Sequence, residues 1–309
     1  MAAVPSQNAR PAVFKPGRSA GRRIPLGRQL MLQALCLFIL FTVLFPILWV
    51  VSMSLDGRNQ ARPKNLNFDP ANMSLNGYRK VIEQPTGNKV SFAKLALNST
   101  LLAGGVSFGA VLVGVSAAYA FSRLRFSGRG FFMLAILFVL LLPNTAGIAP
   151  LFVLLNSVNI GEFNLRNSLY GVGMAMVSGA LPFAIWNLKG YLDTIPKELE
   201  EAATIDGASS LQTFFRIILP LATPALAVTA FLGFMAGWTE FAVSWAFLTD
   251  PQDFTLAMAL YNMTGQYSGS IPWSRFAAMA LMVAAPVSIV YLLLQKYIVS
   301  GLTVGGVKG

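Results

Sequence analysis

Between two long apolar runs the chain reads Glu200-Glu201-Ala202-Ala203-Thr204-Ile205-Asp206-Gly207-Ala208 and, further on, Ile217-Ile218-Leu219-Pro220. A stretch with this many charges does not belong in the hydrocarbon core of a bilayer, whereas the runs on either side are long enough to cross it. This alternation predicts the fold: apolar helices with a polar, helix-forming segment between them.

The composition places the whole chain in a membrane. Of its 309 residues 55% are hydrophobic and 11% are charged, and its mean hydropathy is +0.61. A soluble domain carries about 25% charged residues, so this chain cannot cover itself with a solvated surface. We expect an all-α polytopic membrane protein.

Six apolar runs are long enough to span a bilayer. The third run is expected to break near Pro143 and Pro150. The six expected spans are 30–55, 97–121, 131–155, 168–188, 221–247 and 276–298.

The charges orient these spans. The net charge is +11, and residues 1–28 contain six basic and no acidic side chains. This pattern is typical of a cytoplasmic flank under the positive-inside rule, which we prefer to a nucleic-acid-binding arm. With six spans both termini are then cytoplasmic. The expected organisation is a basic tail at 1–28, a first helix at 30–55, an extracytoplasmic loop at 56–96, a core of five spans at 97–298 and a cytoplasmic tail at 299–309.

Several classes of enzyme are disfavoured. The chain has no histidine and one cysteine, Cys36, which lies within the first span. It also lacks the G-x-x-x-x-G-K-[ST] pattern of phosphate-binding loops. We therefore expect no catalytic residue, no metal site and no cofactor in this chain.

Residues 189–220, here called the acidic segment, hold five acidic and three basic side chains. A cytoplasmic loop should be basic, so topology does not explain the excess of acid. Pro196 suits a first helical position and Gly207 a helix end. Ser209 with Gln212 predicts a capping box that starts a second helix, which Pro220 would end. On that helix Leu211, Phe214, Phe215 and Ile218 form an apolar stripe.

Two kinds of neighbour fit such a helix pair. It could lie on lipid headgroups as an interfacial element. An acidic face is repelled by an anionic inner leaflet, which favours a protein partner.

The segment resembles the EAA loop of ABC importer permeases. Glu201-Ala202-Ala203 is followed after three residues by Gly207, after nine more by Ile217, and then by Leu219-Pro220. The resemblance implies that a short coupling helix docks on a partner ATPase. The implied docking residues are Glu200, Glu201, Ala202, Ala203, Asp206, Gly207, Ala208, Ile217, Leu219 and Pro220.

The C-terminal sequence Gly301-Leu302-Thr303-Val304-Gly305-Gly306-Val307-Lys308-Gly309 is similar to that of MalG-type permeases of carbohydrate importers. With the six spans and Tyr119-Ala120-Phe121-Ser122-Arg123-Leu124-Arg125-Phe126, the likeness extends from about Leu30 to Gly309. It implies the type I ABC importer permease fold and alternating access for maltose, maltodextrins or a related sugar. The implied partners are a second, MalF-like permease, two MalK-like ATPase subunits that bind ATP and Mg, and an extracytoplasmic sugar-binding protein. The tail residues Gly305, Gly306, Val307, Lys308 and Gly309 would contact the ATPases. Gly265, Gln266, Tyr267, Ser268 and Gly269 would contact the binding protein.

Other candidates stay open. Glu240 is the only acidic residue inside an expected span, where it either lines the translocation path or bonds to a neighbouring helix. Four tryptophans near span ends fit an aromatic belt better than sugar stacking (Trp186, Trp238, Trp245 and Trp273). The alternative functions are a permease of the same class for trehalose or glycerol phosphate, and an ion-coupled secondary carrier.

Overall fold

The computed structural model describes residues 25–58, 66, 69–265 and 273–305. The chain divides into two compact units, residues 1–48 and 49–309. Helix α1 (Leu26–Ser54) begins in the first unit and ends in the second. Along residues 25–48 it exposes a continuous row of leucine and phenylalanine side chains, as a helix surrounded by lipid would.

The second unit is built from helices. Its long helices are α3 (Phe92–Arg123), α6 (Leu169–Leu192), α10 (Thr223–Trp238) and α13 (Trp273–Gly305). Shorter ones are α2 (Asn76–Glu83), α4 (Arg129–Leu140), α5 (Ile148–Asn156), α7 (Glu198–Ile205), α8 (Ser210–Thr213), α9 (Leu219–Leu221), α11 (Ala242–Phe247) and α12 (Leu256–Gly265). Single turns are η1 (Pro70–Asn72), η2 (Asn144–Gly147), the π-helical η3 (Phe214–Ile218) and η4 (Pro251–Asp253). Strands β1 (Asn159–Ile160) and β2 (Phe163–Asn164) form a small antiparallel hairpin.

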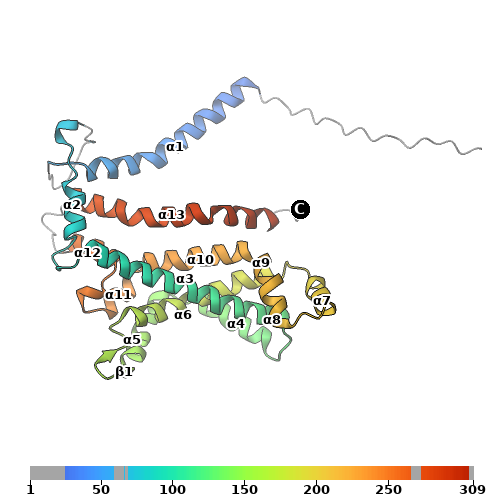
Figure 1. Cartoon of the computed structure of the whole chain (residues 1–309). Coiled ribbons are helices and arrows are strands. Elements are labelled where there is room, and N and C mark those ends of the chain that lie inside the picture. The colour runs from blue at the N-terminus through green and yellow to red at the C-terminus, as the bar shows by residue number, and fades with distance from the viewer. Residues whose placement is uncertain (1–24, 59–65, 67–68, 266–272, 306–309) are drawn as a thin grey trace, which may run out of the picture. The chain divides into compact units, whose positions relative to one another are not determined.

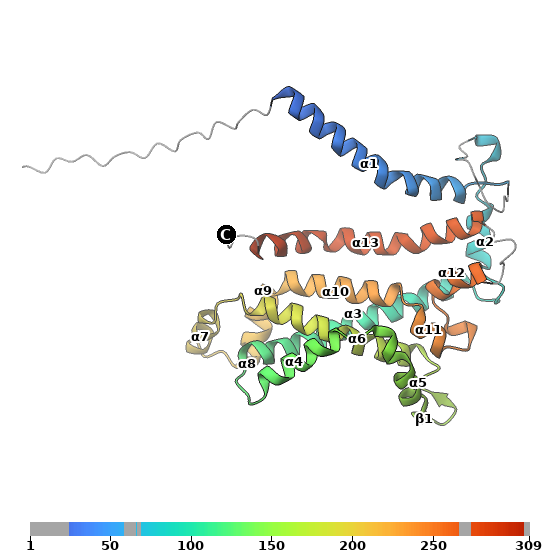
Figure 2. The same cartoon turned by 180° about the vertical axis from the view of Figure 1, so that it is seen from behind.

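Helix α3 lies at the centre of this unit, side by side with α6 and α10 in both views (Figures 1 and 2). Small residues allow the close approach. A Cβ at Gly237 would lie 2.7 Å from the Ala103 Cα, and one at Gly109 would lie 2.8 Å from a Val177 methyl carbon. Gly109 and Gly114 of α3 thus lie against α6, whereas a Cβ at Gly104 or Gly105 would meet no atom within 4 Å.

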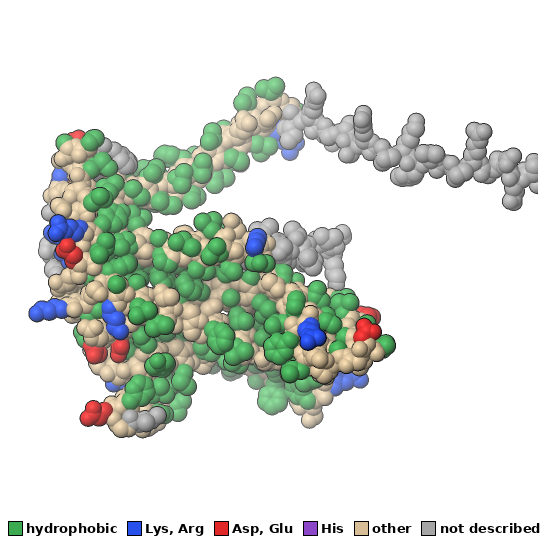
Figure 3. Space-filling view, in the orientation of Figure 1, with side chains coloured by type: hydrophobic (Ala, Val, Ile, Leu, Met, Phe, Trp, Pro, Cys, Tyr) green, Lys and Arg blue, Asp and Glu red, His purple; other side chains and the backbone are tan. Residues whose placement is uncertain are grey.

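The membrane-spanning character of the chain is confirmed. Among the residues that the structure describes, four helices are long and apolar enough to cross a bilayer, and there are up to six if each of two bent pairs is one span. The first pair, α4 and α5, bends by 97° at residues 141–144, as expected near Pro143, whereas the break expected near Pro150 is absent because Pro150 lies within α5. Figure 3 shows apolar side chains along the middle of the helices, whereas most charged side chains lie at their ends.

Two expected loops contain helices. In the 56–96 loop, α2 buries Val81, and the Tyr78 hydroxyl lies 2.9 Å from the Ser54 Oγ at the end of α1. Helix α3 begins within that loop at Phe92, five residues before Leu97, because the Ser91 side chain caps it. The polar loop expected at 248–272 includes α12, whose Leu256, Ala259 and Met263 are buried. Their spacing of three and four residues is helical, a signal that the polar neighbours obscured.

The fifth expected span is broken at both ends. Residues 221–247 divide into α10 and α11, separated by Thr239–Phe241. Before α10, residues 210–221 meet it at an angle of 76°.

Candidate functional site

The first half of the acidic segment is an elbow of two short helices, α7 and α8. Gly207 joins them with a φ of +79°, a conformation that favours glycine. The predicted capping box is present: the Gln212 amide donates to the Ser209 Oγ (3.3 Å), and the Ser209 amide donates to the Gln212 Oε1 (2.8 Å). Pro196 is not at the first helical position, because α7 begins at Glu198 with Lys197 as its N-cap.

The second half of the acidic segment differs from its prediction. Pro220 does not end the helix but lies within α9, which follows the π-helical turn η3. The chain bends only at Ala222. Proline has no amide hydrogen, so Pro224 cannot bond the Pro220 carbonyl, which instead accepts a bond from the Thr223 hydroxyl (2.7 Å).

The expected apolar stripe of the acidic segment faces two ways. Ile218 is fully buried and the Phe214 ring packs 4.9 Å from the Tyr119 ring. Leu211 and Phe215 are exposed, by 68% and 55%. The π turn changes the helical repeat between these positions, so they no longer share one face.

The tip of the elbow is exposed. Glu201, Ala202, Asp206 and Gly207 are accessible, whereas Ala203 is buried and Ala208 half-buried. Ile205 is the most exposed large apolar side chain of the elbow, at 86%. Of the later motif positions, Ile217 and Leu219 are half-buried and Pro220 is exposed. The tip therefore presents carboxylates beside an apolar side chain, as a docking surface would.

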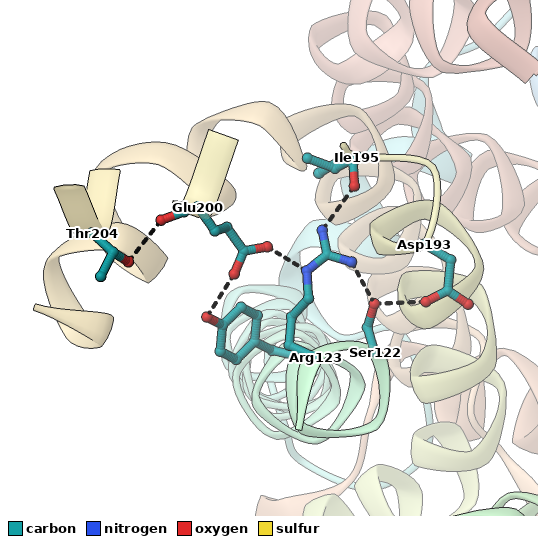
Figure 4. Close-up of polar contacts among 7 residues, drawn as sticks. Ser122, Arg123, Asp193, Ile195, Glu200 and Thr204 are labelled. Carbon is teal, nitrogen blue, oxygen red and sulfur yellow. Dashed lines mark hydrogen bonds and ion pairs between the residues drawn. The ribbon is translucent and has the colours of Figure 1, made fainter. Parts of the chain in front are cut away.

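Glu200 points the other way, toward the end of α3 (Figure 4). Its carboxylate forms an ion pair with Arg123 and accepts a hydrogen bond from the Tyr119 hydroxyl (3.1 Å). The side chains are mostly buried, with 7% of Arg123 and 17% of Glu200 exposed. This carboxylate is held by the chain itself and is not free for a partner.

A second carboxylate continues this cluster. Arg123 donates to the Ser122 Oγ (3.0 Å), which donates to Asp193 (2.6 Å), and Lys189 also donates to Asp193 (2.5 Å). Burial opposes ionisation of Asp193, but the bonds from Lys189 and Ser122 outweigh it and hold its pKa below the ordinary value. Arg123 also donates to the Ile195 carbonyl (2.9 Å), so it bonds the connection between α6 and α7 directly.

The sequence analysis included Glu200 among the docking residues and did not pair it with Arg123. They are 77 residues apart in the chain. The available signal was the spacing of Tyr119 and Arg123, which puts both on one face of a helix. The unexplained excess of acid in residues 189–220 was the matching signal.

Glu240 bonds to the helix that follows it, and its role in a translocation path stays a prediction. Its Oε1 accepts bonds from the amides of Val243 (2.6 Å) and Ser244 (3.3 Å), so it caps the broken span at the start of α11. It also lines a cavity of about 660 Å³ bounded by α6, α10 and the bent pair α4 and α5. Most of the lining is apolar, with Thr145, Ser178 and Thr229 as further polar side chains.

The remaining candidates are only partly described. Gly265 ends α12, and Gln266–Gly269 lie outside the described residues. Helix α13 continues to Gly305, past the expected span end at Ile298, and 306–309 lie outside the described residues. Trp238 is buried and donates to the Val283 carbonyl (3.0 Å), whereas Trp245 is half exposed and packs against Phe241 and Tyr261. Within the described ranges no group of three or more acidic or cysteine side chains could hold a metal ion.

Known proteins resemble this chain over most of its length. Residues 110–304 match the family described as "Binding-protein-dependent transport system inner membrane component". The chain is 32% identical to the galactooligosaccharides transport system permease protein GanQ of Bacillus subtilis (strain 168), over 91% of this chain and 96% of GanQ. It is 35% identical to the maltose/maltodextrin transport system permease protein MalG of Escherichia coli (strain K12), again over 91% and 96%.

Solved structures agree on the fold. One chain in the crystal structure of a bacterial ABC transporter involved in the import of the acidic polysaccharide alginate aligns with a TM-score of 0.71. The alignment covers 88% of this chain and 96% of that one, at 23% sequence identity. The fold is that of type I ABC importer permeases, and the chain belongs to the family of binding-protein-dependent transport system inner membrane components.

Proposed function

We propose that this chain is the permease subunit of an ATP-driven carbohydrate importer. The two relatives named above are both named as permeases for sugars, and each aligns over nine-tenths of this chain. Maltose or maltodextrins are the proposed substrates. Trehalose and glycerol phosphate are the alternatives within the class.

One observation carries the proposed mechanism: the elbow of α7 and α8 is exposed at its tip and fixed at its base. Glu201, Ala202 and Asp206 are accessible. The base is joined to α6 through residues 193–197 on one side and, through α8, η3 and α9, to α10 on the other. A partner that binds the tip and moves it therefore also moves two membrane helices, α6 and α10.

The proposed partner at this tip is an ATPase subunit. ATP and Mg belong to two such subunits, and this chain carries out no catalysis. A second, MalF-like permease completes the pathway, and an extracytoplasmic binding protein that contacts residues 265–269 delivers the sugar. The α7 end is then cytoplasmic, with both termini, and the tail 305–309 reaches the ATPases. When the ATPases close, the elbow carries that motion into the helices, which open outward and later reset.

Gly207→Pro tests the docking surface. Proline fixes φ near −65°, whereas Gly207 has a φ of +79°, so the elbow cannot form. We expect ATPase subunits not to co-purify with the variant, although it still inserts. Gly161→Pro is the matched control, because Gly161 also has a positive φ (63°) but lies in the β1–β2 turn at the other end. Normal ATPase association of Gly207→Pro would contradict the proposal.

Transport by the reconstituted complex tests the class and the substrate. Proteoliposomes with the permeases, the ATPases and the binding protein are supplied with radiolabelled maltose, maltotriose, trehalose or glycerol phosphate. We expect ATP-dependent uptake of maltose or maltotriose. Ion-driven sugar uptake by this chain alone would instead identify a secondary carrier.

A further inference from the structure

We propose that Arg123 is a positioning residue that fixes α7 to the end of α3, so that α3 moves together with the coupling elbow. The inference rests on the proposed function. The covalent chain connects the elbow to α6 and to α10. The proposed contact adds a third connection, to α3, and assigns it to the side chain of Arg123.

The geometry of the pair indicates a fixed contact. The guanidinium of Arg123 and the carboxylate of Glu200 lie in an ion pair that is almost out of solvent, and the Tyr119 hydroxyl binds the second carboxylate oxygen at 3.1 Å. Solvent screens a pair in this environment little, and truncating one partner leaves the other charge buried and uncompensated. Exposed ion pairs such as Arg79–Glu83, with side chains 76% and 59% exposed, provide no such constraint.

Helix α7 has few other contacts that could fix it. Of its eight residues only Ala203 is buried, so apolar packing contributes little to its position. Leu199 and Ile205 are exposed, by 42% and 86%. Glu200 is therefore the side chain that ties α7 to the membrane helices.

Arg123 also binds the connection that leads into α7. It donates to the Ile195 carbonyl and, through Ser122, reaches Asp193 at the end of α6 (Figure 4). One guanidinium thus joins the end of α3, the end of α6 and the first turns of α7. Its planar set of donors suits this role, which the ammonium of a lysine cannot reproduce.

Helix α3 can carry a displacement to the far end of the bundle. The Ser107 hydroxyl donates to the Ala230 carbonyl of α10 (2.8 Å). Near the start of α3, Asn98 donates to the carbonyls of Gln252 (2.7 Å) and Phe254 (2.9 Å), and Ser99 accepts from the Leu256 amide (2.8 Å). Arg123 and Asn98 lie on one continuous helix, so the elbow is connected to the segment that precedes α12.

The test separates coupling from assembly. Arg123→Met removes the charge but keeps the aliphatic stem. Arg125→Met is the matched control, because Arg125 is exposed two residues further on. The full complex, with its binding protein, is reconstituted and supplied with radiolabelled maltose, and both ATP hydrolysed and sugar taken up are measured. We expect Arg123→Met to co-purify with the ATPases and to hydrolyse ATP, whereas sugar transported per ATP falls about tenfold, within the usual range of coupling between sites.

A charge exchange supplies the second readout. Arg123→Glu alone should uncouple the complex, and adding Glu200→Arg, which restores the ion pair but not the bond to the Ile195 carbonyl, should restore part of the transport per ATP. The inference would be overturned if Arg123→Met transported as much sugar per ATP as the wild type. It would also be overturned if the double variant Arg123→Glu/Glu200→Arg transported no more sugar per ATP than Arg123→Glu alone. If Arg123→Met does not accumulate, Glu200→Gln is measured in its place, with the same expected fall in sugar transported per ATP. Wild-type transport per ATP in Glu200→Gln would equally contradict the inference. Failure of the proposed function is distinguishable, because the wild-type complex would then show no ATP-driven uptake.

Discussion

Gly237 tests how closely α10 and α3 must approach. A Cβ at this position would lie 2.7 Å from the Ala103 Cα, 3.2 Å from the Ala103 amide nitrogen and 3.3 Å from the Leu102 carbonyl oxygen. All three neighbours are backbone atoms of a helix, so none can rotate away as a side chain would. Gly237→Ala therefore forces α10 and α3 apart.

Two opposing terms determine the size of this effect. Overpacking a well-packed site costs about 1–3 kcal/mol, and contact with backbone places this case toward the upper end. Replacing glycine by alanine within a helix stabilises the folded state by about 0.5–1 kcal/mol. We expect a net destabilisation of about 2 kcal/mol, or a fall in Tm of roughly 5 °C by the scaling for domains of comparable size.

Gly104→Ala is the matched control. Gly104 lies on α3 beside Ala103, and a Cβ there would meet no atom within 4 Å. The control should keep only the helix-propensity gain, so its Tm should equal or exceed that of the wild type. The measurement is thermal unfolding of the full chain in detergent. A Gly237→Ala variant as stable as Gly104→Ala would show that this approach is not the constraint we infer.

Two further predictions concern carboxylates. Because the pKa of Asp193 is lowered in the folded protein, its stabilisation is complete above the unfolded value and is lost as the pH falls through the folded value. The Tm of the wild type should therefore fall more steeply between about pH 5 and pH 3 than that of Asp193→Asn, and equal slopes would contradict the assigned bonds. Glu240→Gln keeps the oxygen that caps α11 and should preserve Tm, whereas Glu240→Ala leaves buried amides unpaired and should lower the free energy of unfolding by about 1–3 kcal/mol. A large loss of Tm in Glu240→Gln would instead indicate that the charge of Glu240 stabilises the fold.

The sequence predicted those features that depend on local chemistry. Gly207 and the Ser209–Gln212 capping box lie as expected, because a left-handed residue and a reciprocal cap each need only a few neighbouring residues. Apolar length likewise predicted the long helices α1, α3, α6 and α13.

Features that depend on contacts between distant segments were not predicted. Local rules place a helix end at Pro220, but the helix runs on to Leu221 and the chain bends at Ala222. There Pro224 cannot donate to the Pro220 carbonyl, and the Thr223 hydroxyl donates instead. The 248–272 segment is polar on average, yet α12 buries one face against α3 and α13. No single-sequence pattern places those two surfaces together.

The excess of acid in the acidic segment now divides into two groups with different partners. Glu200 and Asp193 bond to Arg123, Ser122 and Lys189, so the chain itself neutralises them. Glu198, Glu201 and Asp206 remain exposed. The first group determines where the elbow lies relative to α3 and α6, and the second is available to a partner's cations. A partner surface for this elbow should therefore be basic opposite α7 and should have an apolar hollow for Ile205, which the exposed tip places beside those carboxylates.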